Sequence, residues 1–183
     1  YPKMALQPLK EEYLLTGPLE ETNQWYAIAK ISGVKLIEAL REQHNRDYVS
    51  LMPTNLYGPG DNYNLKTSHV LPAMLRKFHE AKQNNHADVV LWGTGSPKRE
   101  FLHVDDLANA VVYALENKLN RSLYNIGSGE EVSIKELASL IKNIVGFRGK
   151  IIWDNTKPDG TPRKLLDSSK ISKLGWNSRI NLH

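Results

Sequence analysis

Two hydrophobic periodicities alternate along this chain. Apolar residues at helical spacing predict four helices, at about 22–43, 70–83, after 106 to about 117, and 134–145. The apolar face of the first helix is predicted to include Tyr26, Ala29, Ile37 and Leu40. Pro72 suits the first turn of the second helix, and Ser133 with Glu136 has the spacing of a capping box for the last.

Short apolar runs between these helices predict strands at Tyr48–Met52, Asp88–Trp92, Ser122–Ile126 and Lys150–Trp153. Residues 3–22 lack a sustained period and are predicted as a loop with one short helix near 9–15. Strands that alternate with helices predict an α/β fold. Pro53 stops the first strand and a turn-rich segment, 54–62, follows it. Open α/β sheets bind ligands at such strand ends.

The composition is that of a globular protein, with one ordinary domain or one large and one small lobe. Of its 183 residues, 40% are hydrophobic and 24% are charged. The longest apolar runs are far shorter than a membrane span, which excludes the membrane-protein class. Cysteine is absent, and this excludes a disulfide framework, a thiolate metal site and a cysteine nucleophile within the chain. A cytoplasmic location is expected.

Charge and histidine spacing narrow the class of ligand. The 24 basic and 20 acidic residues give a net charge of +4, and the basic residues occur as scattered pairs. Nucleic-acid arms carry longer basic runs interleaved with aromatic residues, so an anionic small molecule fits better than nucleic acid. The histidines other than His69 show no metal-ligand spacing with one another or with carboxylates, so no metal site is expected.

Tyr26 and Lys30 are four residues apart and therefore lie on one face of the first predicted helix. The lysine charge favours the phenolate, which makes Tyr26 a candidate to exchange a proton with a carbonyl or alcohol oxygen. An ordinary surface pair has the same spacing, and that alternative stays open on the spacing alone. His69 precedes the second helix, where it is either an acid or base or simply the helix cap.

Two glycine pairs, Gly93-x-Gly95 and Gly127-x-Gly129, are not dinucleotide fingerprints, because neither continues as Gly-x-Gly-x-x-Gly into a helix. Enzymes that transfer hydride need a cradle for the pyrophosphate of their cofactor. Residues 1–183 are predicted to lack that cradle.

Several segments together resemble the extended short-chain dehydrogenase/reductase family over essentially the whole chain. The general family patterns are Tyr26-Ala-Ile-Ala-Lys30 and Arg99-Glu-Phe-Leu-His-Val-Asp-Asp106. More specific patterns are Pro53-Thr-Asn-Leu-Tyr-Gly-Pro59, Ser68-His-Val70 and Lys157-Pro-Asp-Gly-Thr-Pro-Arg-Lys-Leu165. These resemble the branch of the family that forms GDP-L-fucose.

The resemblance implies roles for individual residues. Tyr26 would protonate the C4 oxygen of the substrate as NADPH delivers hydride, Lys30 would hold the nicotinamide ribose, and His69 would be the acid of two epimerisations. The residues that bind or border NADP(H) would be Lys30, Pro53, Thr54, Asn55, Leu56 and His69. Those that hold the GDP-sugar would be Lys77, Trp92, Arg99 and Asp159.

The implied fold is Rossmann-like α/β, here without its N-terminal dinucleotide-binding half. Residues 1–56 and 99–126 would belong to the NADP-binding domain, and residues 57–98 and 127–183 to a smaller α/β substrate lobe. The chain would be the C-terminal part of a homodimeric enzyme and inactive by itself. Its cofactor fingerprint, a catalytic serine and a reactive cysteine would lie upstream of Tyr1.

The implied activity is the NADPH-dependent 3,5-epimerisation and 4-reduction of GDP-4-keto-6-deoxy-D-mannose to GDP-L-fucose. Two alternatives stay open. One is another NAD(P)-dependent epimerase, dehydratase or reductase of nucleotide sugars, and the other is a non-catalytic module that binds a nucleotide sugar. An in-frame Gly-x-x-Gly-x-x-Gly region upstream would exclude the binding module.

Overall fold

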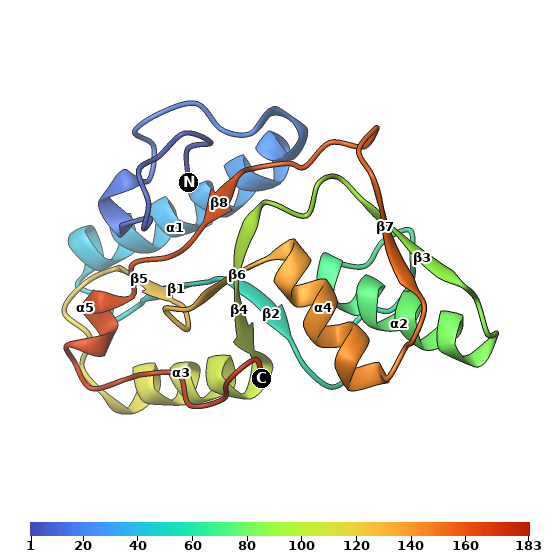
Figure 1. Ribbon diagram of the computed structural model, residues 1–183. Coiled ribbons are helices and arrows are strands. Elements are labelled where there is room, and N and C mark those ends of the chain that lie inside the picture. Colours follow the sequence, from blue (N-terminus) through green and yellow to red (C-terminus); the bar gives the residue numbers. More distant parts are fainter. The chain divides into compact units, whose positions relative to one another are not determined.

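The computed structural model describes residues 1–183 and divides them into two compact units. The first unit is built from residues 1–56, 100–130 and 164–182, and the second from residues 57–99, 131–163 and 183. Figure 1 follows the chain through the elements of both units. None of the helices combines the length and the apolar character that crossing a membrane requires.

The first unit is organised around two parallel strands, β1 (Ser50–Pro53) and β5 (Leu123–Ile126). Its helical elements are η1 (Glu11–Tyr13), η2 (Glu21–Asn23), α1 (Gln24–His44), α3 (Val104–Glu116) and α5 (Ser169–Ser172). Its core is a cluster of buried apolar side chains: Leu102, Ala110, Leu119, Tyr124, Ile126, Ile171 and Trp176. This core fixes β5, whose carboxyl end lies beside that of β1, because Pro53 is paired with Ile126.

Helix α1 turns a different face inward from the predicted one. Tyr26 and Ala29 are exposed, so their prediction on a covered face is wrong, whereas the other two predicted positions are half-buried. The covered stripe runs through Ala27, Ile31 and Val34, and Ile31 is the buried residue of the helix. One residue of offset rotates the face by about 100°. Tyr26 is therefore left open to ligands or partners.

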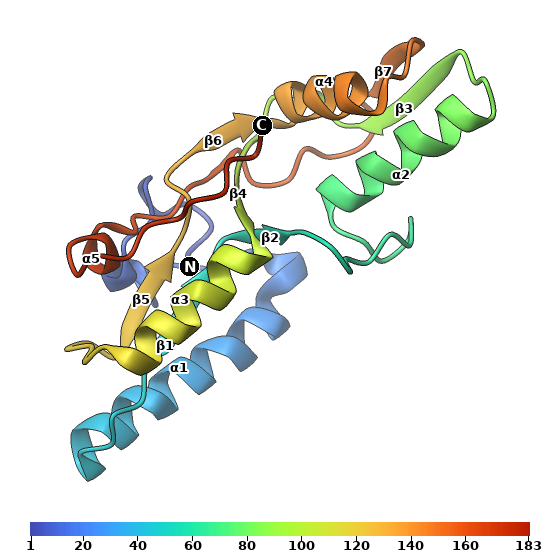
Figure 2. The same ribbon diagram turned by 90° about the horizontal axis from the view of Figure 1, so that it is seen from below.

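The second unit is a parallel pair of strands with two helices packed beside it, as both views show (Figures 1 and 2). The strands are β3 (Asp88–Trp92) and β7 (Lys150–Asp154), and the helices are α2 (Val70–Gln83) and α4 (Ile134–Val145). Val89 and Leu91 are buried, while Val90 and Trp92 are exposed. This period-2 alternation places Trp92 on the open side of the strand.

Four further strands are β2 (Asn55–Tyr57), β4 (Lys98–His103), β6 (Glu131–Ser133) and β8 (Arg163–Lys164). None of them was predicted. Segment 54–62 carries the residues of a turn, and three charged residues open β4, so neither has the apolar pattern that indicates a strand. Within β4, Glu100, Phe101 and Leu102 are all buried, while Arg99 and His103 on either side are half-buried.

Most of the other predicted elements are confirmed. The bounds of α2, α4 and β3 agree with those expected from the sequence. The capping box is also confirmed, because the Ser133 side chain accepts the Glu136 N–H and the Glu136 carboxylate accepts the Ser133 N–H. Strand β1 begins two residues later than predicted and includes Pro53.

Candidate active site

Tyr26 and Lys30 lie one turn apart on the exposed side of α1. The Lys30 ammonium is 5.5 Å from the centre of the Tyr26 ring, a cation–π distance. Tyr26 is 61% exposed. Neither side chain forms a hydrogen bond or an ion pair with another residue of the chain. A phenol and an ammonium are therefore presented together, with their polar atoms free for a ligand.

The strand-end segment, residues 53–56, is held at the carboxyl end of β1. The Thr54 N–H donates to the carbonyl of Ile126 at 3.0 Å, which continues the pairing of β1 with β5. The Thr54 hydroxyl and the Asn55 amide both donate to the main-chain carbonyl of Glu100, at 3.2 and 2.8 Å. These three bonds fix the segment where parallel sheets bind ligands.

His69 is the residue that precedes α2, in the second unit. It occupies the N-cap position with extended backbone, but its imidazole accepts no hydrogen bond from the first turn of the helix. Side-chain capping therefore does not account for this histidine. The neighbouring Ser68 has a buried hydroxyl without a hydrogen-bond partner. An exposed imidazole and an unpaired hydroxyl thus lie next to each other in the sequence.

Lys77 and Arg99 are half-buried cations that form no ion pair with a carboxylate of their unit. The Lys77 ammonium donates to the carbonyl of Val90 at 3.0 Å, and the Arg99 guanidinium donates to that of Lys98 at 2.8 Å. Burial lowers the pKa of both cations. Since a partly buried charge without a counter-ion is unfavourable, both positions suit an anionic ligand.

The loop that follows β3 is bound to a second loop through Asp159. The Thr94 N–H donates to Oδ1 of Asp159 and the Thr94 hydroxyl donates to Oδ2, each at 2.7 Å. Gly93 has a φ of +77°, and a Cβ added there would lie 2.2 Å from Oδ1 of Asp159, so any other residue would be strained and would displace that carboxylate. Beside this contact, Trp92 is 67% exposed and the Lys157 ammonium lies 5.7 Å from its ring centre.

The second unit brings the predicted sugar-nucleotide residues to one region. A Cβ added to Gly160 would lie 3.7 Å from Nη2 of Arg99, so the guanidinium lies beside the loop that contains Asp159. That loop bonds to the residues after Trp92, and Lys77 contacts the same strand, β3. Two cations, an indole surface and a carboxylate are thus grouped around β3.

Sequence reasoning missed Thr94, Lys157 and Glu100. The turn at Gly93–Gly95 was recognised, but the partner of Thr94 is 65 residues away, and no local pattern reveals it. Glu100 is a buried carboxylate, and charged residues are usually expected in solvent. Its neighbours Phe101 and Leu102 are buried as well, so β4 has no alternating pattern that would have placed Glu100 inside.

Comparisons with known proteins identify the family of the chain. A model of the NAD dependent epimerase/dehydratase family matches residues 1–127. "Probable GDP-L-fucose synthase 1" of Oryza sativa subsp. japonica is 60% identical over 182 residues, covering 100% of this chain and 56% of the relative. GDP-L-fucose synthase of Escherichia coli strain K12 is 51% identical, covering 100% of this chain and 60% of the relative. The chain spans little more than half the length of these curated relatives.

Solved structures give the same fold. A GDP-6-OMe-4-keto-L-xylo-heptose reductase from C. jejuni has a TM-score of 0.91 and 37% identity, covering 100% of this chain and 64% of its own. A GDP-L-fucose synthetase from Naegleria fowleri bound to NADP has a TM-score of 0.86 and 31% identity, and the match covers 98% of this chain and 59% of the synthetase chain. These matches confirm the α/β fold class of the extended reductases and epimerases. With a family model that matches residues 1–127 of 183, the chain belongs to the NAD dependent epimerase/dehydratase family.

Proposed function

We propose that the complete protein is a GDP-L-fucose synthase. It would convert GDP-4-keto-6-deoxy-D-mannose to GDP-L-fucose by epimerisation at C3 and C5 and reduction at C4 with NADPH. Relatives of that name match the whole chain at 60%, 62% and 51% identity. The structural observation that carries the proposal is the Tyr26–Lys30 pair, whose phenol and ammonium are free of other partners.

The residues of this chain fit the nicotinamide end of NADP(H). Lys30 offers an unpaired ammonium, and the strand-end segment is fixed at the ends of two parallel strands. The buried hydroxyl of Ser68, which lacks a partner, indicates a site completed by a ligand next to His69. NADPH supplies the hydride of the reduction. Lys30 would bind its ribose, and residues 53–56 with His69 would border or hold the cofactor.

In the reduction, Tyr26 donates its phenolic proton to the C4 oxygen of the sugar. The Lys30 ammonium, 5.5 Å from the centre of the same ring, stabilises the phenolate that this transfer leaves behind. The exposure of α1 on this side leaves room for the sugar to approach the hydroxyl.

In the epimerisations, His69 donates a proton to C3 and C5 on one face of the sugar ring, and a base removes a proton from the other face. An imidazole changes charge near neutral pH, which suits this role. His69 is exposed and is not used to cap α2, so both ring nitrogens are available for proton transfer.

The GDP moiety is proposed to bind around β3. Lys77 and Arg99 lack carboxylate partners and would bind the diphosphate, while Trp92 offers a flat apolar surface. Asp159 would accept from a sugar hydroxyl or the guanine edge. Although both of its oxygens bond to Thr94, each carboxylate oxygen has a second lone pair.

We also propose a division of labour along the chain. Residues 1–56 and 99–126 would serve the NADP side, and residues 57–98 and 127–183 the substrate side, in a cytoplasmic homodimer. Residues 164–182 pack within the first compact unit and carry none of the proposed ligand contacts.

Variants of the complete protein test the two proton-transfer roles. Tyr26→Phe is expected to slow NADPH oxidation by about 100-fold or more, while deuterium exchange from solvent at C3 and C5 continues. His69→Gln is expected to suppress the exchange. Tyr63→Phe, at an exposed tyrosine outside the site, is the control and should match the wild type in both assays. Equal loss of both activities in both site variants would overturn this assignment.

A second candidate is the 4-reduction of a GDP-4-keto sugar without epimerisation. The match to the heptose reductase, with a TM-score of 0.91, favours it. Turnover of GDP-4-keto-6-deoxy-D-mannose with NADPH, followed by identification of the product, separates the two. GDP-L-fucose supports the first candidate, and an unepimerised 6-deoxy sugar supports the second.

A further inference from the structure

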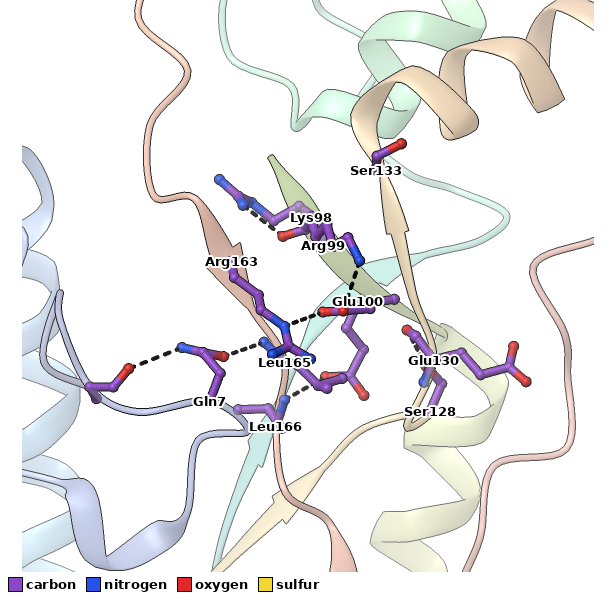
Figure 3. A network of polar contacts seen from close by, with 12 residues as sticks. Gln7, Lys98, Arg99, Glu100, Ser128, Glu130, Ser133, Arg163, Leu165 and Leu166 are labelled. Atoms are coloured by element: carbon purple, nitrogen blue, oxygen red, sulfur yellow. Dashed lines mark hydrogen bonds and ion pairs between the residues drawn. The ribbon is translucent and has the colours of Figure 1, made fainter. Parts of the chain in front are cut away.

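Glu100 is a fully buried carboxylate that the proposed reaction does not use. It is 0% exposed, and it forms no ion pair with a cation. The Gly129 N–H donates to its Oε1 at 2.8 Å. The Leu166 N–H donates to its Oε2 at 2.9 Å (Figure 3). Main-chain N–H groups thus compensate both carboxylate oxygens, and a side-chain hydrogen bond from Thr54 also favours the charged form. Inside the protein, each of these donors matters more than it would at the surface.

The carboxylate joins parts of the first unit that are far apart in the sequence. Gly129 lies in the loop after β5, whereas Leu166 bridges to Leu9 near the start of the chain. A Cβ added to Gly127 would lie 2.3 Å from Oε1 of Glu100. The loop after β5 therefore closes directly onto the carboxylate, with a glycine where no side chain fits.

The main-chain carbonyl of the same residue holds the strand-end segment. It accepts from the Thr54 hydroxyl at 3.2 Å and from the Asn55 amide at 2.8 Å. The side chain of Glu100 thus contacts the loop after β5, and its carbonyl contacts the segment after β1. The carboxylate and the carbonyl belong to one residue. A shift of the carboxylate would therefore displace the loop after β5 and the segment after β1 together.

We propose that Glu100 is a positioning residue for NADP(H) binding. Its carboxylate fixes the main chain of β4, and the carbonyl fixed in this way holds Thr54 and Asn55 in place to border the nicotinamide. The inference rests on the proposed function, and it adds a residue that contacts neither cofactor nor substrate.

Asp106 in α3 provides a matched control. It is 4% exposed and, like Glu100, accepts main-chain N–H groups, here those of Arg179 and Ile180, at 2.9 to 3.1 Å. It makes no hydrogen bond to the strand-end segment. Asp106→Asn therefore measures how the loss of a buried carboxylate changes stability when residues 53–56 are not affected.

The test compares Glu100→Gln with Asp106→Asn in the complete protein. The glutamine oxygen can accept one N–H, but its amide nitrogen then faces the other donor, which loses its partner. Glu100→Gln is expected to raise the Kd for NADPH about tenfold, measured by calorimetric titration without substrate. Both variants are expected to lower the Tm to a similar extent. Asp106→Asn, however, is expected to leave the Kd for NADPH at the wild-type value.

A double-mutant cycle examines the link itself. Asn55→Ala should also raise the Kd for NADPH, and its effect should be less than additive with Glu100→Gln because both break the same connection. Thr54→Val tests the carbonyl contact if Glu100→Gln does not fold, and it should raise the Kd about threefold.

Several results would overturn the proposal: a wild-type Kd in Glu100→Gln or in Thr54→Val, an equal rise in Asp106→Asn, or additive effects in the cycle. Wild-type protein that does not bind NADPH would overturn the proposed function and this inference with it. Wild-type protein that binds NADPH while Glu100→Gln binds it equally well would overturn the inference alone.

Discussion

The bond between Thr94 and Asp159 gives the most direct test of the substrate side. Thr94→Val keeps the shape of the side chain and the N–H donor to Oδ1, but it removes the hydroxyl that donates to Oδ2. The same hydroxyl also bonds to the Ser96 hydroxyl and accepts the Ser96 N–H within its own turn. Thr94 is not itself a proposed ligand contact. If the loop after β3 must be fixed to present Trp92 and Asp159, the variant should nevertheless bind the GDP-sugar more weakly.

The structure sets the size of this effect. The lost bond that joins the two loops is 2.7 Å long and has a charged acceptor, but it lies in an exposed loop. The bonds lost to Ser96 stay within one turn and are replaced by bonds to water. Bonds to charged groups contribute about 1.5–3 kcal/mol, and solvent exposure reduces this to about 1 kcal/mol. At 1.4 kcal/mol per factor of ten, the Kd for the GDP-sugar should rise about fivefold.

The assay is calorimetric titration of the complete protein with the GDP-sugar, without NADPH. The control is Thr156→Val, because the Thr156 hydroxyl also donates to an aspartate, at 2.5 Å, but to its near neighbour Asp154. That bond joins no second loop, so the control should bind like the wild type. A wild-type Kd for Thr94→Val, or an equal loss in Thr156→Val, would refute the reasoning.

Three further predictions concern stability. Gly93→Ala should lower the Tm more than Gly60→Ala, because both have positive φ but only Gly93 meets an atom, Asp159 Oδ1 at 2.2 Å; equal shifts would contradict this. Ser133→Ala should cost about 1 kcal/mol of unfolding free energy in urea through loss of the capping box, and an unchanged midpoint would count against it. Burial raises the pKa of Glu100, so its contribution to stability is complete below the ordinary glutamate pKa and is lost as pH rises through the raised value. Glu100→Gln should therefore flatten the fall of unfolding free energy with pH, and an unchanged slope would exclude this origin.

Local sequence patterns predicted the second unit best. Helices α2 and α4 have strong periodicity, a proline in the first turn of one and a capping box on the other, so their ends are encoded by neighbouring residues. Strand β3 is a short run whose side chains alternate between buried and exposed. In each case the determining interactions lie within about one turn or one strand.

The features that were missed depend on distant partners. The inward face of α1 includes the buried Ile31, whereas the periodicity of the helix sequence predicted a face rotated by one residue. Strand β4 begins with three charged residues, and Glu100 is tolerated inside because residues distant in the sequence, Gly129 and Leu166 among them, supply donors. The partner of Thr94 is likewise 65 residues away. The predicted site residues were identified by motif, while the contacts that hold them were not.

The interleaved path of the chain has a consequence for biosynthesis. The first unit needs residues 1–56, 100–130 and 164–182, and residues 57–99 and 131–163 interrupt it. On the ribosome, the carboxylate of Glu100 cannot gain its second donor until Leu166 has been synthesised, and β3 waits for β7, since Asp88 pairs with Lys150. Contacts of such long range slow folding. Neither unit can therefore fold from one uninterrupted stretch during translation, and neither can be excised as a single contiguous piece.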